Sequence, residues 1–139
     1  MESSSAAGYS GTPLVKKLGI RDSDRVLLVN APDNYQILVA PLPPGVHFVN
    51  QPDVTVALGH VFVSQREALA KLLRELRLQL NAEAALWISW PKKASKVPTT
   101  ITEDSIRELA LPLGFVDIKV CAVTEVWSGL KLVVRKELR

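Results

Sequence analysis

The loop after residue 90 is the part of the sequence best suited to bind a ligand. It carries Lys92, Lys93 and Lys96 and no acidic residue, and Ser95 adds a hydroxyl. A helix is predicted to begin just beyond it, where backbone N–H groups lack partners. Ammonium, hydroxyl and N–H groups together attract anions, although a lysine-rich loop is more often simply solvated. The pattern predicts a site for a small anionic ligand.

Two tryptophans accompany this loop. Trp90 comes directly before it, and Trp127 is expected in the turn of a C-terminal hairpin, beside Ser128 and Gly129. A tryptophan in such a place either packs on its own protein or lines a pocket, and self-packing is the commoner case. We keep Trp90 and Trp127 as candidate ligand contacts on this basis.

A second polar group follows the first apolar run of the chain. Asn30 and Asp33 stand in the sequence NAPDN, which is typical of a turn. The carboxyl ends of parallel strands meet at one edge of a sheet, where ligands of α/β proteins bind. We therefore expect Asn30 and Asp33 to share that edge with the lysine loop, while a plain Asx turn is the alternative interpretation.

No group of residues predicts catalysis or metal binding. His47, His60 and Cys121 do not stand at the spacing of zinc ligands. Cys121 lies in an apolar strand pattern typical of an inert thiol, and His60 in one typical of a core histidine. The sequence contains neither a nucleophile elbow nor a phosphate-binding loop. A non-enzymatic role is favoured, and no cofactor or metal is predicted.

Composition predicts one folded domain in a reducing compartment. The chain has 139 residues, 47% of them hydrophobic, a net charge of +3 and a single cysteine. The polar stretch 1–10 predicts a disordered tail, and residues 11–139 predict a single α/β domain. No apolar run reaches the roughly 20 residues that cross a bilayer, and no targeting signal is recognised. We expect a cytoplasmic protein without a membrane partner.

Hydrophobic patterns predict the elements that position these residues. Continuous apolar runs predict strands over residues 25–30, 46–49, 54–63 and 85–90. Leucines at helical spacing predict a helix over 65–80, with a capping box from Ser64 to Glu67, and Thr102 is expected to cap the next helix. Residues 35–40 fit a helix or a strand. Two β-rich stretches, 116–126 and 130–136, predict a hairpin. The order predicts a three-layer, Rossmann-like α/β fold with a mostly parallel sheet and a C-terminal antiparallel hairpin.

This order resembles the class I methyltransferase fold. The segments LGI at 18–20 and DRVL at 24–27 are similar to the approach to the first strand of that superfamily. The family continues with a glycine-rich turn against the cofactor, whereas residues 30–34 contain no glycine and Pro32 has no N–H. Asn50 stands where the family has an acid for the ribose. The chain is also too short for one strand–helix unit of the family's sheet.

From residue 8 to 139 the chain also resembles a small bacterial family of domains of unknown function. The resemblance rests on GYSGTPLVKKLGI, LWISWPKKASKVPT, ALPLG and VCAVTEVWSGLKLVVRKE. It implies a bacterial source and carries no activity with it.

Three hypotheses follow. The first is a degenerate methyltransferase-like domain that binds a small anionic ligand without ordinary methyl transfer, through Asn30, Asp33, Trp90, Lys92, Lys93, Ser95, Lys96 and Trp127. The second is an atypical S-adenosylmethionine-dependent methyltransferase. The third is a protein- or nucleic-acid-binding module that uses the basic loop with Arg135, Lys136 and Arg139. Nucleic acid is the less favoured partner, because acids and bases are mixed along the chain. The oligomeric state is not predicted.

Overall fold

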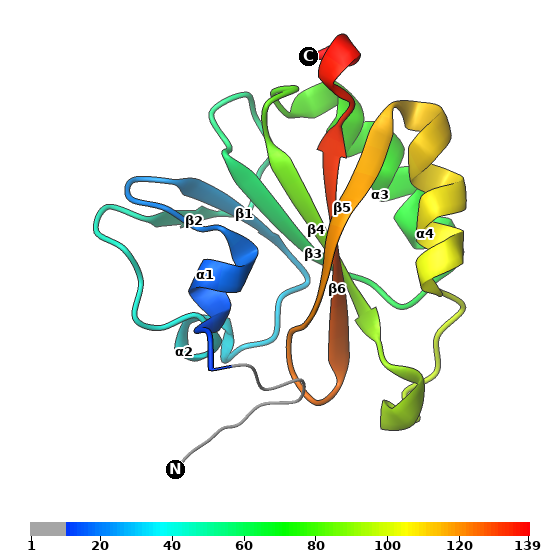
Figure 1. Ribbon diagram of the computed structural model, residues 1–139, viewed down its shortest axis with the longest axis horizontal. Coiled ribbons are helices and arrows are strands. Elements are labelled where there is room, and N and C mark those ends of the chain that lie inside the picture. The colour runs from blue at the N-terminus through cyan, green and yellow to red at the C-terminus, as the bar shows by residue number, and fades with distance from the viewer. Residues whose placement is uncertain (1–10) are drawn as a thin grey trace.

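The structure is a computed structural model that describes residues 11–139, so the tail predicted over residues 1–10 lies outside it. Its centre is a six-stranded sheet with the order β2-β1-β3-β4-β6-β5 (Figure 1). The strands are β1 (Arg25–Val29), β2 (His47–Val49), β3 (Leu58–Phe62), β4 (Ala85–Pro91), β5 (Phe115–Ala122) and β6 (Trp127–Val134).

The fold class predicted from the sequence is confirmed. Strands β1 to β4 are parallel, and β6 runs antiparallel to both β4 and β5. Helices α3 (Arg66–Gln79) and α4 (Glu103–Ala110) cover one face of the sheet, while α1 (Leu14–Leu18) and α2 (Tyr35–Leu38) cover the other (Figure 1). The ambiguous stretch 35–40 is thus a single helical turn. Short 3-10 turns follow β4, α4 and β6, at Lys93–Ser95, Leu111–Leu113 and Lys136–Leu138.

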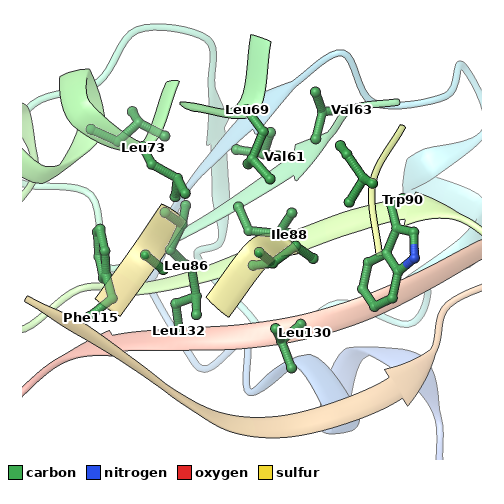
Figure 2. Packing of buried hydrophobic residues seen from close by; sticks show 14 of the residues in the cluster. Val61, Val63, Leu69, Leu73, Leu86, Ile88, Trp90, Phe115, Leu130 and Leu132 are labelled. Carbon is green, nitrogen blue, oxygen red and sulfur yellow. The ribbon is translucent and has the colours of Figure 1, made fainter. Parts of the chain in front are cut away.

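The larger core lies between the sheet and α3 and α4 (Figure 2). The helix predicted from its leucine stripe is α3, which buries Leu69 and Leu73. Because side chains alternate along a strand, β4 sends Ile88 and Trp90 into this core and Trp87 to the other face. Trp90 is 8% exposed and lies among aliphatic side chains.

The capping box predicted for α3 is wrong. The N-cap residue is Gln65, and it makes no side-chain cap hydrogen bond. The N–H of Arg66 instead donates to Thr100 Oγ1, 2.7 Å away on the segment before α4. This bond joins two segments distant in sequence, which a local pattern cannot reveal.

The predicted position of Trp127 in a turn is also wrong. Residues 123–126 form the turn, and Trp127 is the first residue of β6. Thr124 Oγ1 accepts the N–H groups of Val126 and Trp127 at 3.0 and 3.1 Å, which closes the turn without glycine or proline. Gly129, which suggested the turn, lies inside β6.

The strand order reverses between β1 and β3. From β1 the chain passes to β2 on one side, and β3 lies on the other side of β1. In parallel sheets, such a reversal opens a crevice at the carboxyl ends of the strands. That edge carries α2, the turn between β5 and β6 and the loop after β4, all in the lower part of Figure 1.

Candidate functional site

The structure places the predicted polar residues on either side of β3. Asn30 and Asp33 follow β1 and are exposed, whereas the lysine loop follows β4. Strands β1 and β4 are separated by β3, so their ends lie about 10 Å apart at the usual strand spacing. The two groups share the carboxyl edge of the sheet but do not converge on one point of it.

The hydroxyl of the lysine loop is already used by the loop itself. Ser95 Oγ donates to the carbonyl oxygen of Lys92 at 2.6 Å and accepts the N–H of Val97 at 3.2 Å. Lys92, Lys93 and Lys96 make no ion pair within residues 11–139. What the loop offers a ligand is therefore ammonium charge on an exposed surface.

The N-terminus of α4 is likewise capped from within. Thr102 Oγ1 accepts the N–H of Ser105 at 3.1 Å, and Ser105 Oγ accepts the N–H of Thr102 at 2.8 Å. Thr102 thus caps α4 as predicted. This capping box occupies N–H groups that the anion hypothesis assigned to a ligand.

The two candidate tryptophans lie on opposite faces of the sheet. Trp90 belongs to the core under α3 and α4, while Trp127 packs against the core under α1 and α2. The indole of Trp127 meets Phe62 edge to face, with ring centroids 5.1 Å apart. Because the sheet separates them, the two indoles cannot contact one small ligand together.

A pocket of about 810 Å³ lies on the α1/α2 side of the carboxyl edge. Its walls come from three segments: residues 11–14 at the start of α1, the stretch from Pro32 to Ala40 with α2, and the turn 123–127. Ligand pockets for small molecules and cofactors are of this size. We call this hollow the α1–α2 pocket.

The lining of the α1–α2 pocket is apolar with one charge. Leu14, Ile37, Leu38 and Trp127 supply much of the wall, and Glu125 is the one ionisable side chain among the lining residues in the described part of the chain. A wall with an indole and a carboxylate suits a neutral or cationic ligand with a flat apolar body. It does not suit an anion, because no lining group compensates a negative charge.

The lysine loop adjoins this pocket without lining it. The N–H of Lys92 donates to the carbonyl oxygen of Val126 at 2.7 Å, which ties the loop to the turn 123–127. No lysine is among the residues that line the pocket in the described chain. Of the predicted site residues, Trp127 alone lines it.

Sequence reasoning missed Ile37 and Leu14 and treated Glu125 as an isolated acid. These residues come from segments about 25 and 90 positions apart, and no local pattern links them. The turn chemistry around Asn34, which also lines the pocket, was the nearest available signal.

A buried chain of hydrogen bonds holds α2 against the sheet. His60 Nδ1 lies 2.8 Å from Tyr35 Oη, and His60 Nε2 lies 2.7 Å from Ser89 Oγ. Burial lowers the pKa of His60 to about 3 and raises the pKa of Tyr35 above its ordinary range. His60 is therefore neutral at pH 7, as predicted for a core histidine. Ser89 is fully buried, so its hydroxyl has no path to a substrate.

The remaining reactive groups form no second centre in the described chain. Burial raises the pKa of Cys121, opposed by the charges of Lys17 and Lys119, so its thiol stays protonated at neutral pH. Residues 11–139 contain no cluster of three or more histidine, cysteine, aspartate or glutamate side chains able to hold a metal ion. None of the helices in this range is long and apolar enough to cross a bilayer.

Solved structures with a similar architecture include SAM-dependent methyltransferases. A SAM-dependent methyltransferase from Aquifex aeolicus superposes with a TM-score of 0.64 at 18% identity, over 87% of this chain and 88% of that one. The chain has the methyltransferase fold. A putative type 11 methyltransferase from Sulfolobus solfataricus gives 0.56 at 15% identity, over 81% and 85% of the two chains.

A further structure of this fold was solved with its ligand. Fibrillarin from Aeropyrum pernix, in complex with natively bound S-adenosyl-L-methionine, gives a TM-score of 0.58 at 12% identity, over 87% of this chain and 72% of that one. No protein-family model matches the chain, and no curated protein does. At such identities the likeness establishes the fold alone.

Proposed function

We propose that this chain is an atypical S-adenosylmethionine-dependent methyltransferase that holds its cofactor in the α1–α2 pocket. A shared fold does not by itself establish a ligand. The proposal therefore depends on the chemistry of the pocket, and the ligand bound in the fibrillarin structure supplies the first candidate.

The observation that carries the proposal is the single charge of the pocket lining. S-adenosylmethionine combines a flat nucleoside with a positive sulfonium centre. Glu125 offers a carboxylate to that centre, and the indole of Trp127 offers both an apolar surface and a cation–π contact. Leu14, Ile37 and Leu38 provide the apolar wall that a nucleoside buries. When bound, S-adenosylmethionine supplies an electrophilic methyl group.

The turn after β1 departs from the usual methyltransferase pattern. Glycine in this place lets the backbone approach a cofactor closely, and here residues 30–34 contain none. Asn30 instead takes up the left-handed conformation at φ 57°, and Pro32 has no N–H to donate. Tyr35, at the start of α2, is fixed by its bond to His60. The side chains of the pocket, rather than the backbone of this turn, would hold the ligand.

The second candidate is ligand binding without methyl transfer, in the bacterial cytoplasm that the sequence predicts. One observation favours it. Apart from Glu125, the pocket lining in the described chain has no side chain suited to take a proton from a methyl acceptor. The sequence resemblance to a bacterial family of domains agrees with either candidate, since that family implies no activity.

Thermal unfolding with a small ligand panel tests the proposal. The panel is S-adenosylmethionine, S-adenosylhomocysteine, adenosine and inorganic pyrophosphate, each at millimolar concentration. A ligand at 100 times its Kd stabilises the native state by about 2.7 kcal/mol, which is a shift of several degrees in a domain of this size. We expect shifts with the nucleoside ligands and none with pyrophosphate. A shift with pyrophosphate alone would contradict the proposal and support a site for a small anion.

Release of S-adenosylhomocysteine separates the two candidates. The protein is incubated with S-adenosylmethionine in the presence of fractionated bacterial extract, and the product is measured by mass spectrometry. Turnover that depends on both protein and extract supports the methyltransferase. Binding without turnover across all fractions supports the non-catalytic candidate.

A further inference from the structure

Three lysines gather where the end of α1 meets the middle of the hairpin. Lys119 of β5 and Lys131 of β6 are direct partners in the strand register. Lys119 Nζ donates to the carbonyl oxygen of Lys17, in the last turn of α1, at 3.4 Å. Lys131 Nζ lies 5.9 Å from the centre of the Trp87 ring. We call Lys17, Lys119 and Lys131 the lysine cluster; it lies apart from the loop after β4.

The charges of the lysine cluster are not neutralised. None of the three lysines makes an ion pair within residues 11–139. The acid nearest along β5, Asp117, points to α4, where its carboxylate accepts a bond from Arg107 at 2.9 Å. Like charges directly opposite in a sheet are unfavourable, so an external anion would stabilise this arrangement.

Lys131 is half-buried and lies near two further cations. Burial, then the charges of Lys119 and Arg21, lower the pKa of Lys131. Arg21 follows α1 and brings a fourth cation to the same side, although Asp24 lies close enough to accept its backbone N–H at 2.8 Å.

We infer that the lysine cluster binds the phosphodiester backbone of a nucleic acid. Its ammonium groups come from three elements and act as separate point charges, which suits successive phosphates better than one small anion held in a backbone cradle.

An acidic peptide is the less suitable partner. A peptide strand would add to a free edge of the sheet, and the edge strand beside the lysine cluster is β5. The register of β5 is interrupted between Asp117 and Lys119 by a bulge, and bulges oppose strand addition at an edge. The surface therefore offers charge without a regular set of backbone partners.

Fluorescence anisotropy with a labelled 20-nucleotide single-stranded oligonucleotide tests the inference. We expect binding that weakens steeply with salt. The variant Lys17→Gln/Lys119→Gln/Lys131→Gln removes three phosphate contacts, so the slope of log Kd against log salt should fall by about 2, and affinity at 0.1 M salt by about 100-fold. The double variant Lys17→Gln/Lys119→Gln leaves the half-buried Lys131 in place and should show about two thirds of the change in slope.

The matched control removes three positive charges from other parts of the surface. Lys71, Arg74 and Lys136 are exposed and lie on α3 and beyond β6, and their replacement by glutamine should leave most of the binding intact. Equal losses in the two triple variants would overturn the inference, as would a larger loss in Lys92→Gln/Lys93→Gln/Lys96→Gln. Absence of oligonucleotide binding at low salt, or equal competition by polyglutamate, would overturn it too. None of these readouts uses S-adenosylmethionine, so failure here leaves the proposed function standing.

Discussion

Tyr35 Oη and His60 Nδ1 lie 2.8 Å apart in the buried interior between α2 and β3. Both side chains are at most 2% exposed, and their rings meet nearly at right angles. This contact fixes the helical turn that forms one wall of the α1–α2 pocket, because Tyr35 opens α2 and Ile37 and Leu38 follow it. The stability of the pocket wall thus depends on a polar bond in the core.

Replacement of Tyr35 by phenylalanine tests this dependence. The substitution keeps the ring and leaves His60 Nδ1 buried without its partner, which costs about 1–3 kcal/mol. We expect that loss in the free energy of unfolding, measured by urea denaturation. The exposed residue His47 provides the control, since His47→Gln should change stability by less than about 0.5 kcal/mol. An unchanged stability in Tyr35→Phe would show that the bond contributes nothing.

The protein should become less stable as the pH falls, because of His60. Its pKa is about 3 in the folded chain, against an ordinary value of 6.5, so the unfolded chain binds one more proton between these values. The contribution of neutral His60 to the free energy of unfolding is therefore fully present above pH 6.5. It decreases by about 1.4 kcal/mol per pH unit as the pH falls towards 3.

The measurement compares unfolding free energies at pH 7 and pH 5. The native chain should lose about 2 kcal/mol more over this interval than the variant His60→Gln, which has no group to protonate there. Parallel losses in the two proteins would mean that other groups carry the acid sensitivity.

Ile37 separates ligand binding from folding. Its side chain is 77% exposed although it lines the α1–α2 pocket, so Ile37→Ala should leave stability within about 0.5 kcal/mol of the native value. Contact with a nucleoside would bury it, and its loss should weaken binding about 5- to 30-fold. Leu78, 87% exposed on α3, is the matched control, and Leu78→Ala should alter neither quantity. Equal affinities for S-adenosylmethionine in these two variants would place the ligand elsewhere.

The sequence predicts the framework of this fold well where hydrophobic patterns are long. Strand β1, helix α3 and β4, which is buried from Leu86 to Pro91, all follow from the spacing of their apolar residues. Alternation along β4 also predicts that Trp87 and Trp90 point to opposite faces, as they do. Such patterns depend only on which side of each element faces the core, and neighbouring residues along the chain are enough to reveal this.

Contacts between distant segments explain the errors. Gly129 suggested a turn, yet it lies within β6, where an added Cβ would come within 3.1–3.3 Å of Val123 and the Trp87 ring. Ser64 suggested a cap, yet α3 receives its bond from Thr100. In both cases the residue type is typical of the predicted feature, but contacts with residues distant in sequence determine the local structure.

The candidate site was predicted in part for the same reason. The carboxyl edge of the sheet follows from the order of strands and helices, and Trp127 was singled out by type. The opposite placement of Trp90 and Trp127 follows from the position of the β5–β6 turn. The sequence predicts this turn at residues 127–129, whereas it lies at residues 123–126. Glu125 becomes a candidate ligand contact only because α1 and α2 place apolar pocket walls beside its carboxylate, which the sequence alone does not show.

Calorimetric titration of S-adenosylmethionine and S-adenosylhomocysteine tests the central claim most directly. The two ligands differ by the methyl group and the positive charge on sulfur, which Glu125 is proposed to contact. We expect S-adenosylmethionine to bind about 10-fold tighter, or about 1.4 kcal/mol, and the difference to vanish in Glu125→Gln. Glu83→Gln, at an exposed acid outside the pocket, should preserve it. Equal affinities in the native chain, or a preference that persists in Glu125→Gln, would contradict the account.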